Sequence, residues 1–392
     1  MKEKFLRELA DIQTGPFGSQ LHKEDYVADG TPIVTVEHLG NKMFSEQNLP
    51  RVSNTDKNRL KKYVLKQGDI VFSRVGSVDR CSYVDQKHDG WMFSGRCLRV
   101  RPTSEIDSEY LYYYFCLEET KQFVRNISVG ATMPSINTKL LGEVVVTFPE
   151  LEQQKRISGI LSAIDSKIEV NQKINDNLYE MVNVYYTSLF KDVECEMTTI
   201  GNYAERIYSG GTPTTSNAAY WGGTFGWFSS GETQNRFVNS TEKSITQTGI
   251  DNSSTKLASK HDIVMASAGQ GFTRGQTSML LIDTYVNQSV IVIHADRNIL
   301  PYLFWNLANR YEELRAISDS SSIRGSLTTK MIAAFEIPLA NNDVIQTFSD
   351  FAWAVIPQIE NNLLENERLA ALRDSLLPKL MSGEIDVSTV HL

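Results

Sequence analysis

The amino-acid sequence predicts a mixed α/β (α+β) protein. We expect two similar globular domains separated by two long helices, which pack as an antiparallel coiled coil with pseudo-twofold symmetry. Two observations predict this class. One ordered set of landmarks occurs twice, in residues 1–190 and 197–382, at an offset of about 192 residues. Each set ends in a long stretch whose apolar residues recur at spacings of three and four, which indicates an amphipathic helix.

The repeated landmarks are short segments in the same order. Residues 67–71 (QGDIV) return as 260–264 (KHDIV), and 110–115 (YLYYYF) return as 302–307 (YLFWNL). Residues 95–100 likewise return as 288–293, and Thr138-Lys139 as Thr329-Lys330. Duplication of a whole domain, unlike a short solenoid repeat, indicates two similar sites held apart. A two-part target is therefore the first functional expectation.

The repeat divides the chain into four segments: a first domain at 1–149, a first long helix at 150–196, a second domain at 197–342, and a second long helix with the C-terminal tail at 343–392. In the first domain, β-branched runs bounded by glycines predict strands near residues 33–36, 70–72, 98–100 and 144–146. Residues 110–125 predict one continuous helix. The second domain repeats the plan, with strands near 263–265 and 290–293.

Each long helix carries a seam of residues expected to face the other helix. The first seam includes Ile164, Ile168, Asn171, Asn175 and Leu178, and the second includes Val355, Ile359, Asn362, Asn366 and Leu369. A buried asparagine costs stability but fixes register and partner choice. The alternative is that the four asparagines lie on a solvated edge.

The second helix contains a proline within its seam. Pro357 removes a backbone hydrogen bond and clashes with the preceding turn, so we expect a kink or a break there, with the seam resuming at Ile359. We expect this helix to end near residues 376–378, with Gly383 just past its end.

The composition favours a globular protein of the reducing cytoplasm. The sequence has no apolar run as long as a membrane span, and its charged N-terminus does not resemble a signal peptide. Its four cysteines, Cys81, Cys97, Cys116 and Cys195, show no CxxC spacing. The net charge of −8 is concentrated in the helices, with 5 basic against 8 acidic residues in 151–196 and 3 against 7 in 346–392. Both domains can therefore present local basic patches.

The motifs of several enzyme classes are absent from the sequence. There is no (Asp/Asn)-Pro-Pro-(Tyr/Phe) loop for an adenine methyltransferase, no phosphate loop and no His-Glu-x-x-His metal site. The six histidines are scattered, so we expect no metal and no cofactor in this chain. Residues 269–275 (GQGFTRG) come nearest to a nucleotide loop, but their spacing is wrong, and a flexible turn is the favoured interpretation.

Several segments resemble the specificity subunit of type I restriction–modification systems. They are 376–385 (LLPKLMSGEI), 147–157 (TFPELEQQKRI), 209–213 (SGGTP) running to 220–223 (YWGG), and 68–71 (GDIV). The resemblance covers essentially the whole chain. The second copy departs from the pattern twice: His261 replaces the glycine of GDIV, and 337–342 (IPLANN) lacks the EQQKR run.

The resemblance implies a non-catalytic reader of double-stranded DNA. Residues 1–149 and 197–342 would be target-recognition domains, each reading one half of a split, asymmetric site. The helices would space the halves and dock two methyltransferase subunits, which carry S-adenosylmethionine, and restriction/translocase subunits would join the complex. The alternative function is a two-lobed adaptor that binds protein or sugar ligands, with the helices as an oligomerisation rod. A standalone methyltransferase is disfavoured by the missing motif.

Base edges are read by Arg or Lys at guanine and by Asn or Gln at adenine. Loops 73–80 and 267–274 are the first candidates, followed by loops 130–137 and 320–326. Within and beside these loops, the candidate DNA contacts are Arg74, Ser77, Arg80, Gln234, Asn235, Arg236, Gln270, Arg274 and Arg324. Lys61 and Lys62 belong to a basic cluster suited to phosphates, which position a protein without specifying sequence. For each residue the alternative is a solvated surface side chain.

Overall fold

A computed structural model describes residues 1–18, 20–40, 42–130, 132–269, 273–320 and 325–388. The chain forms two compact units, one of Met1–Ile168 with Arg368–Leu392 and the other of Glu169–Glu367. Each unit contains one globular domain and one part of each long helix, α6 (Leu151–Phe190) and α11 (Asn342–Ser382). Each domain can therefore be described together with the pair of helix halves that packs against it.

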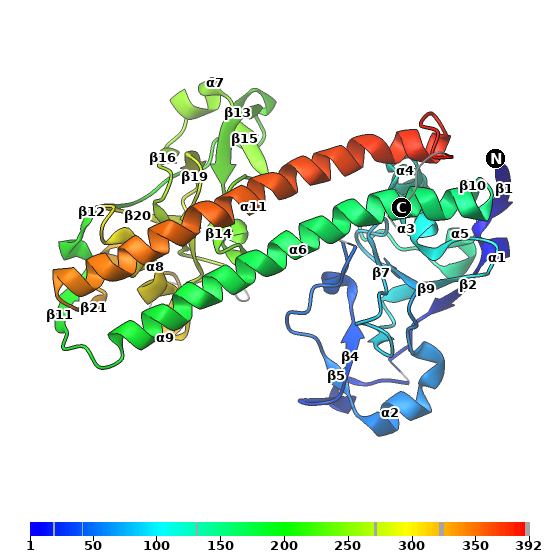
Figure 1. Cartoon of the computed structure of the whole chain (residues 1–392), viewed down its shortest axis with the longest axis horizontal. Helices are drawn as coiled ribbons and strands as arrows, with labels where there is room; N and C mark the ends of the chain where they lie inside the picture. The colour runs from blue at the N-terminus through cyan, green and yellow to red at the C-terminus, as the bar shows by residue number, and fades with distance from the viewer. Residues whose placement is uncertain (19, 41, 131, 270–272, 321–324, 389–392) are drawn as a thin grey trace. The chain divides into compact units, whose positions relative to one another are not determined.

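The first unit is built on two four-stranded sheets (Figure 1). The main sheet is antiparallel and has the order β2 (Ala10–Thr14), β9 (Cys97–Pro102), β6 (Ile70–Ser73), β7 (Cys81–Tyr83). The smaller sheet has the order β3 (Tyr26–Val27), β5 (Arg51–Val52), β4 (Thr31–Val34), β8 (Met92–Phe93). β1 (Lys2–Phe5) pairs with β10 (Val145–Phe148). The helices are α1 (Leu6–Leu9), α2 (Asn54–Arg59), α3 (Ser108–Cys116), α4 (Glu118–Ile127) and α5 (Thr138–Leu141).

The second unit repeats this plan with one more strand. Its main sheet has the order β12 (Ala204–Ser209), β20 (Val290–Ala295), β17 (Ile263–Ala266), β18 (Thr277–Leu280), β14 (Phe237–Val238). The smaller sheet has the order β15 (Lys243–Ile245), β13 (Trp221–Phe228), β19 (Thr284–Val286), β16 (Lys256–Ala258). β11 (Glu196–Thr199) pairs with β21 (Glu336–Leu339). The helices are α7 (Gln247–Asp251), α8 (Leu300–Asn309), α9 (Tyr311–Ser320) and α10 (Thr329–Ala333).

The main sheet of each domain is buried on both faces. In β6, Ile70 and Phe72 pack in the cluster that contains α3 and α6, whereas Val71 packs with the smaller sheet. In β17, Ile263 and Met265 pack with α8, and Val264 packs with the smaller sheet. Alternate residues of a strand point to opposite faces, so these strands are apolar along their whole length. This explains why the sequence shows them as continuous apolar runs.

The predicted strands at 70–72, 98–100, 144–146, 263–265 and 290–293 correspond to β6, β9, β10, β17 and β20. The single helix predicted over 110–125 is wrong. The chain is extended at Leu117 (ψ 134°), which separates α3 from α4. The corresponding helical stretch of the second domain is interrupted at Arg310, which separates α8 from α9. α3 is buried along most of its length, whereas α4 buries only Thr120 and Val124, so one straight helix could not serve both surfaces.

Of the kink or break predicted at Pro357, the break is wrong, because α11 runs without interruption to Ser382. The end predicted at 376–378 is likewise wrong, since α11 continues past Pro378. Both prolines are exposed, so the hydrogen bonds that they remove lie on the solvent side of the helix. Gly383 follows the last helical residue with φ +78°, the left-handed conformation that glycine adopts easily after a helix.

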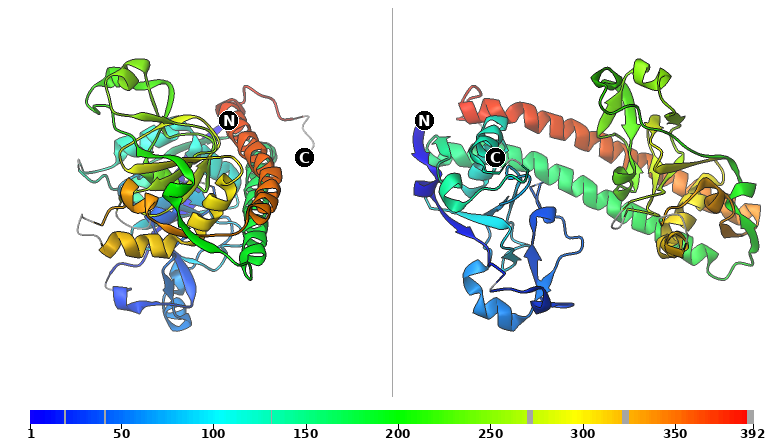
Figure 2. Two further views of the ribbon diagram at one scale, coloured as in Figure 1. Left: turned by 90° about the vertical axis from the view of Figure 1, so that its left-hand side faces the viewer. Right: turned by 180° about the vertical axis from the view of Figure 1, so that it is seen from behind.

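The two long helices pack against each other within each unit, and Figures 1 and 2 show them side by side. In the second unit, the Asn171 side chain donates to Glu365 (2.7 Å) and to Asn366 (2.9 Å). Asn362 donates to Asn175 (2.8 Å), which in turn donates to a backbone carbonyl, that of Ile359 (3.3 Å). The residue numbers of the partners in α11 fall as the residue numbers along α6 rise, so the two helices are antiparallel.

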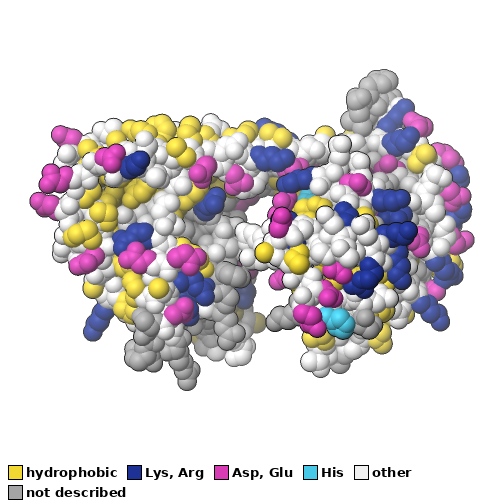
Figure 3. Space-filling model, turned by 90° about the horizontal axis from the view of Figure 1, so that it is seen from below, with side chains coloured by type: hydrophobic (Ala, Val, Ile, Leu, Met, Phe, Trp, Pro, Cys, Tyr) yellow, Lys and Arg dark blue, Asp and Glu magenta, His cyan; other side chains and the backbone are white. Residues whose placement is uncertain are grey.

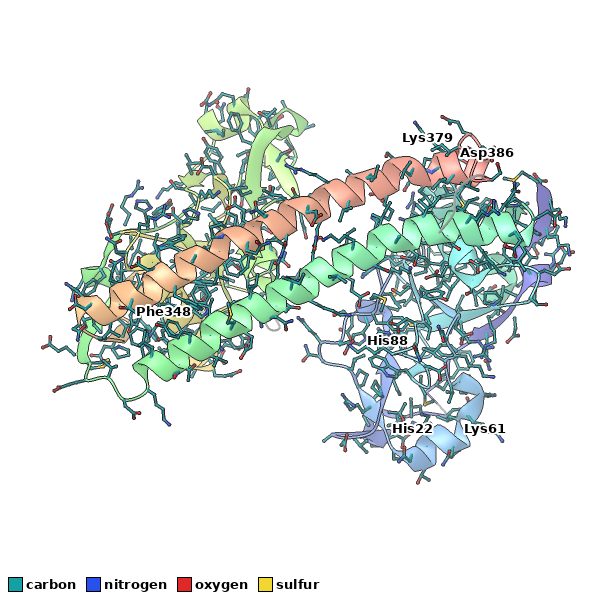
Figure 4. The ribbon with its side chains drawn as sticks, in the orientation of Figure 1. His22, Lys61, His88, Phe348, Lys379 and Asp386 are labelled. Carbon is teal, nitrogen blue, oxygen red and sulfur yellow. The ribbon has the colours of Figure 1, made fainter. Side chains whose placement is uncertain are left out.

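The asparagines of the seam are therefore not on a solvated edge. Asn171, Asn175 and Asn362 are 1%, 5% and 7% exposed, and Asn366 is half-buried. Val355 and Ile359 are buried beside them, whereas Ile164, Ile168, Leu178 and Leu369 are half-buried. Phe348 of α11, labelled in Figure 4, is fully buried between the helix pair and the second domain.

The contact between Asn175 and Asn362 gives a first prediction. Replacing Asn362 by Leu removes the donor to Asn175 and leaves a buried amide oxygen unsatisfied, which costs about 1–3 kcal/mol. Replacing both asparagines by Leu leaves no such orphan, so the double variant should lose less stability than the two single variants combined. Thermal unfolding of the four proteins of this cycle measures the difference. Strictly additive losses would contradict the contact.

His261 occupies the turn at which the first domain has Gly68. Both residues have positive φ, +76° for His261 and +90° for Gly68. The left-handed region costs a non-glycine residue about 1–2 kcal/mol. The His261 ring packs 4.8 Å from the Trp353 ring of α11, and this contact offsets the backbone cost. The departure of the second copy from the GDIV pattern thus preserves the turn and changes its contact.

We predict that His261→Gly is about 1 kcal/mol more stable than His261→Ala, because both lose the ring and only alanine keeps the strain. Burial lowers the pKa of His261. Below about pH 6.5 the unfolded chain therefore binds more protons than the folded chain, and the wild type loses stability as the pH falls. The glycine variant should show a weaker dependence. Unfolding midpoints between pH 5 and 8 test both points, and equal stability of the two variants would contradict the backbone argument.

Candidate nucleic-acid interface

In the first domain, three loops meet at one end of the main sheet. β2 and β6 end there, and β7 and β9 begin there, because the strands are antiparallel. Gly15 donates its N–H to the carbonyl of Cys97 (3.2 Å), and Arg74 donates its N–H to that of Arg96 (2.8 Å). We call this region the loop end of the first domain.

A fourth loop, which follows α4, joins the loop end. Its residue Ile136 donates to the carbonyl of Arg74 (2.9 Å), and Gly76 donates to the carbonyl of Pro134 (2.8 Å). Two loops that the sequence proposed as separate DNA contacts, 73–80 and 130–137, are thus joined by backbone hydrogen bonds. They form one surface.

The second domain has an equivalent loop end. Gly210 donates to the carbonyl of Asn287 (3.2 Å), and Ser267 donates to that of Ser289 (2.8 Å). The segment after α9 joins them where Leu327 donates to the carbonyl of Ser267 (2.8 Å). The structure therefore repeats the same convergence of loops. The predicted contacts Gln270 and Arg324 lie outside the described residues.

The three predicted contacts in loop 73–80 have different surroundings. Arg74 is half-buried: its guanidinium donates to the carbonyl of Gly95 (3.1 Å) and lies 5.4 Å from the centre of the Phe17 ring. Ser77 and Arg80 are exposed. The Arg74 guanidinium thus donates one hydrogen bond within the loop end, whereas Ser77 and Arg80 are exposed to solvent.

Arg274 holds two segments of the second domain together. Its side chain is 12% exposed, pairs with Asp319 of α9, and donates to the carbonyl of Gly325 (2.6 Å). The first domain has a matching ion pair of reversed polarity, in which Arg125 of α4 binds Asp79 of the loop. The first-domain pair connects the loop before β7 to α4. The second-domain pair connects the loop before β18 to α9. Arg274 therefore stabilises the loop.

The triplet Gln234, Asn235 and Arg236 lies near the loop end of the second domain, because β14 runs parallel to β18. All three residues are exposed. The guanidinium of Arg236 lies 4.2 Å from the ring centre of Tyr179 in α6 and 3.9 Å from the Asp176 carboxylate. Arg236 thus faces the helix, and Gln234 and Asn235 are the members of the triplet available to a ligand.

Lys61 and Lys62 are exposed on the turn that follows α2. This turn contacts the segment that leaves the loop end, because the Tyr63 hydroxyl donates to the Gln20 side chain (2.6 Å) and Arg59 donates to the Gln20 carbonyl (2.9 Å). Figure 4 shows Lys61 and His22 at the same end of the first domain. Figure 3 shows several groups of Lys and Arg side chains over this domain, interspersed with acidic ones.

Residues that follow β2 and β12 also lie at the loop ends, although they were not among the contacts that the sequence predicts. Phe17 is 53% exposed there. In the second domain Thr212 donates its hydroxyl hydrogen to the exposed Gln288 side chain. The signal was present in the sequence, as a Gly-Pro-Phe or Gly-Gly-Thr segment directly after the first strand of each main sheet.

Two similar domains, each presenting a loop end with polar and basic side chains, define a binding protein with two related sites. The family model of the type I restriction modification DNA specificity domain matches residues 1–180 and 193–366. The chain belongs to this family, and it is similar to specificity subunits of type I restriction enzymes. The predicted family is confirmed, and the alternative of an adaptor for protein or sugar ligands gains no support.

Two relatives show the extent of the similarity. The HindI specificity subunit of Haemophilus influenzae is 21% identical, over 83% of this chain and 88% of its own. The MjaIX specificity subunit of Methanocaldococcus jannaschii is 22% identical, over 74% and 71%. The crystal structure of the type I S subunit from M. genitalium has a TM-score of 0.55 at 16% identity, covering 97% of this chain and 95% of that one. The predicted fold class is confirmed.

Two observations apply to the part of the chain that the structure describes. Its helices include none that is both long enough and apolar enough to cross a membrane. Among the same residues, no group of three or more His, Cys, Asp or Glu side chains is placed to hold a metal ion.

The ion pair at Arg274 gives a third prediction. If Arg274 stabilises its loop, Arg274→Ala should lower the unfolding free energy by roughly 1–2 kcal/mol, because it removes hydrogen bonds from a largely buried group. Arg274→Asp should cost more, and Asp319→Arg added to it should recover part of the loss by restoring the polarity seen in the first domain. Urea unfolding measures these changes. An Arg274→Ala protein of wild-type stability that loses sequence discrimination would instead make Arg274 a base contact.

Proposed function

We propose that this chain is the DNA-reading subunit of a type I restriction–modification complex. Each loop end reads one half of a bipartite, asymmetric site in double-stranded DNA. The observation that carries this proposal is the duplication of the loop end on one scaffold with different side chains. Two equivalent surfaces of unequal chemistry suit two half-sites of unequal sequence.

The division of labour follows from the chemistry of the exposed side chains. Ser77, Arg80, Gln234 and Asn235 are exposed and can bond base edges. Lys61 and Lys62 suit the phosphate backbone, which supplies affinity and registers the domain on the duplex. Arg74, Arg236 and Arg274 position these surfaces, since each is engaged within the protein.

We further propose that the chain is not itself a catalyst. Two methyltransferase subunits dock on the helices and bind S-adenosylmethionine, and restriction/translocase subunits complete the assembly in the cytoplasm. The sequence supports this division because it lacks the loop with which adenine methyltransferases hold the flipped base.

The test compares the purified full-length chain with its complex. The chain alone should transfer no methyl group from S-adenosylmethionine to DNA. Together with its cognate methyltransferase subunit, it should direct methylation to one bipartite site, mapped by single-molecule sequencing. Methylation by the chain alone would falsify the non-catalytic role. Methylation by the complex without a bipartite preference would overturn the reading role.

A further inference from the structure

Glycines directly after β2 and β12 approach neighbouring backbone closely at the two loop ends. In the first domain, a Cβ atom at Gly15 would collide with the carbonyl of Ser94, and one at Gly95 would collide with that of Pro16. The backbone after β2 and the backbone before β9 can cross this closely because both residues at the crossing, Gly15 and Gly95, lack a side chain. Two more backbone bonds fix the turn, as Gln20 and Leu21 both donate to the Phe17 carbonyl (2.8 and 3.2 Å).

The side chain of Phe17, two residues after Gly15, is exposed to solvent. Apolar aromatic side chains are normally buried, yet the Phe17 ring is 53% exposed. The half-buried Arg74 guanidinium lies 5.4 Å from the ring centre while it donates to the carbonyl of Gly95. Arg74 therefore braces the ring and places a positive charge beside it, which suits a ring that contacts DNA.

The second domain uses the same place differently. Gly210 follows β12 as Gly15 follows β2, and a Cβ atom there would collide with the carbonyl of Val286. Two residues further on, Thr212 stands where the first domain has Phe17. Gln288 stands where the first domain has Gly95. The Thr212 hydroxyl donates to the Gln288 amide oxygen and so orients an exposed carboxamide.

We propose that this paired position is a base-reading site in both domains. Phe17 reads by apolar contact with a thymine methyl group, and Gln288, oriented by Thr212, reads adenine with its amide. The inference rests on the function proposed above and names side chains that carry it. The amide fits because its nitrogen can donate to adenine N7, while its oxygen has a second lone pair for the adenine amino group.

The two chemistries suit two half-sites of different sequence. An apolar ring and an oriented amide favour different bases of an A·T pair in the major groove, the ring the thymine methyl and the amide the adenine edge. The protein changes its preference by exchanging the side chains at this position, while a glycine directly after β2 and directly after β12 allows a close backbone approach in each domain. Discrimination therefore depends on Phe17 in the first domain and on Gln288 in the second.

The experiment uses the full-length chain in complex with its methyltransferase subunit. The DNA is a set of duplexes carrying the mapped site with one base pair changed at a time. Phe17→Ala should lower discrimination about tenfold at one base pair of one half-site, and Gln288→Ala should do so in the other half-site. Replacing thymine by uracil at the first pair should weaken the wild type and leave Phe17→Ala unaffected. Lys61→Ala is the matched control and should weaken all duplexes alike.

Each outcome decides between the alternatives. If Phe17→Ala and Gln288→Ala weaken every duplex equally, or change nothing, the position does not read bases and the inference fails. If both variants alter the same half-site, the assignment of one position to each domain fails. Unchanged discrimination at the other half-site and an unchanged melting temperature show that the variant is folded. A wild-type complex without sequence preference would overturn the proposed function itself.

Discussion

The register of α6 against α11 is the constraint on which both units depend. In the first unit, Leu161 of α6 and Leu380 of α11 belong to the same buried cluster as the main sheet. In the second unit, Val182 of α6 and Phe348 of α11 belong to the same buried cluster as the main sheet of that unit. A slip of either helix would remove these residues from both cores and would separate the asparagines from their partners. Apolar contact tolerates such a slip better than directional hydrogen bonds do, so the polar seam specifies the register.

A second polar contact joins the helices to the first domain. Asp165 of α6 accepts hydrogen bonds from Arg373 of α11 (2.7 Å) and from the hydroxyl of Tyr113 in α3 (2.5 Å). Burial and the Asp165 carboxylate raise the pKa of Tyr113, so this hydroxyl keeps its proton and remains a donor. One carboxylate thus connects both helices and the domain core, which makes its removal more disruptive than the loss of a surface pair.

The sequence predicted those features that depend on local pattern. Buried strands such as β6 and β17 appear as apolar runs, and the repeat located both sets of loops. The errors concern features that depend on the tertiary surroundings. Whether Pro357 breaks a helix depends on which side faces solvent, and the α3–α4 break reflects two surfaces that one helix cannot cover. The DNA contacts of Arg74 and Arg274 stay predictions, but the sequence could not show that both side chains are engaged within the protein, because their partners, Gly95 and Asp319, are distant in sequence.

The two copies of the repeat share structural positions more closely than they share residue types. This distinguishes the positions that maintain the fold from those that can contact a ligand. The loop-to-helix ion pair keeps its place while its charges exchange, from Asp79 with Arg125 to Arg274 with Asp319. The turn before β6 and β17 keeps a positive φ, although glycine becomes histidine. The crossing at Gly15 and Gly210 keeps glycine in both copies, because a backbone neighbour leaves no space there for a side chain. Where the backbone is fixed so tightly, side chains beside it can vary without disturbing the fold. A position of that kind can acquire new specificity at little cost in stability.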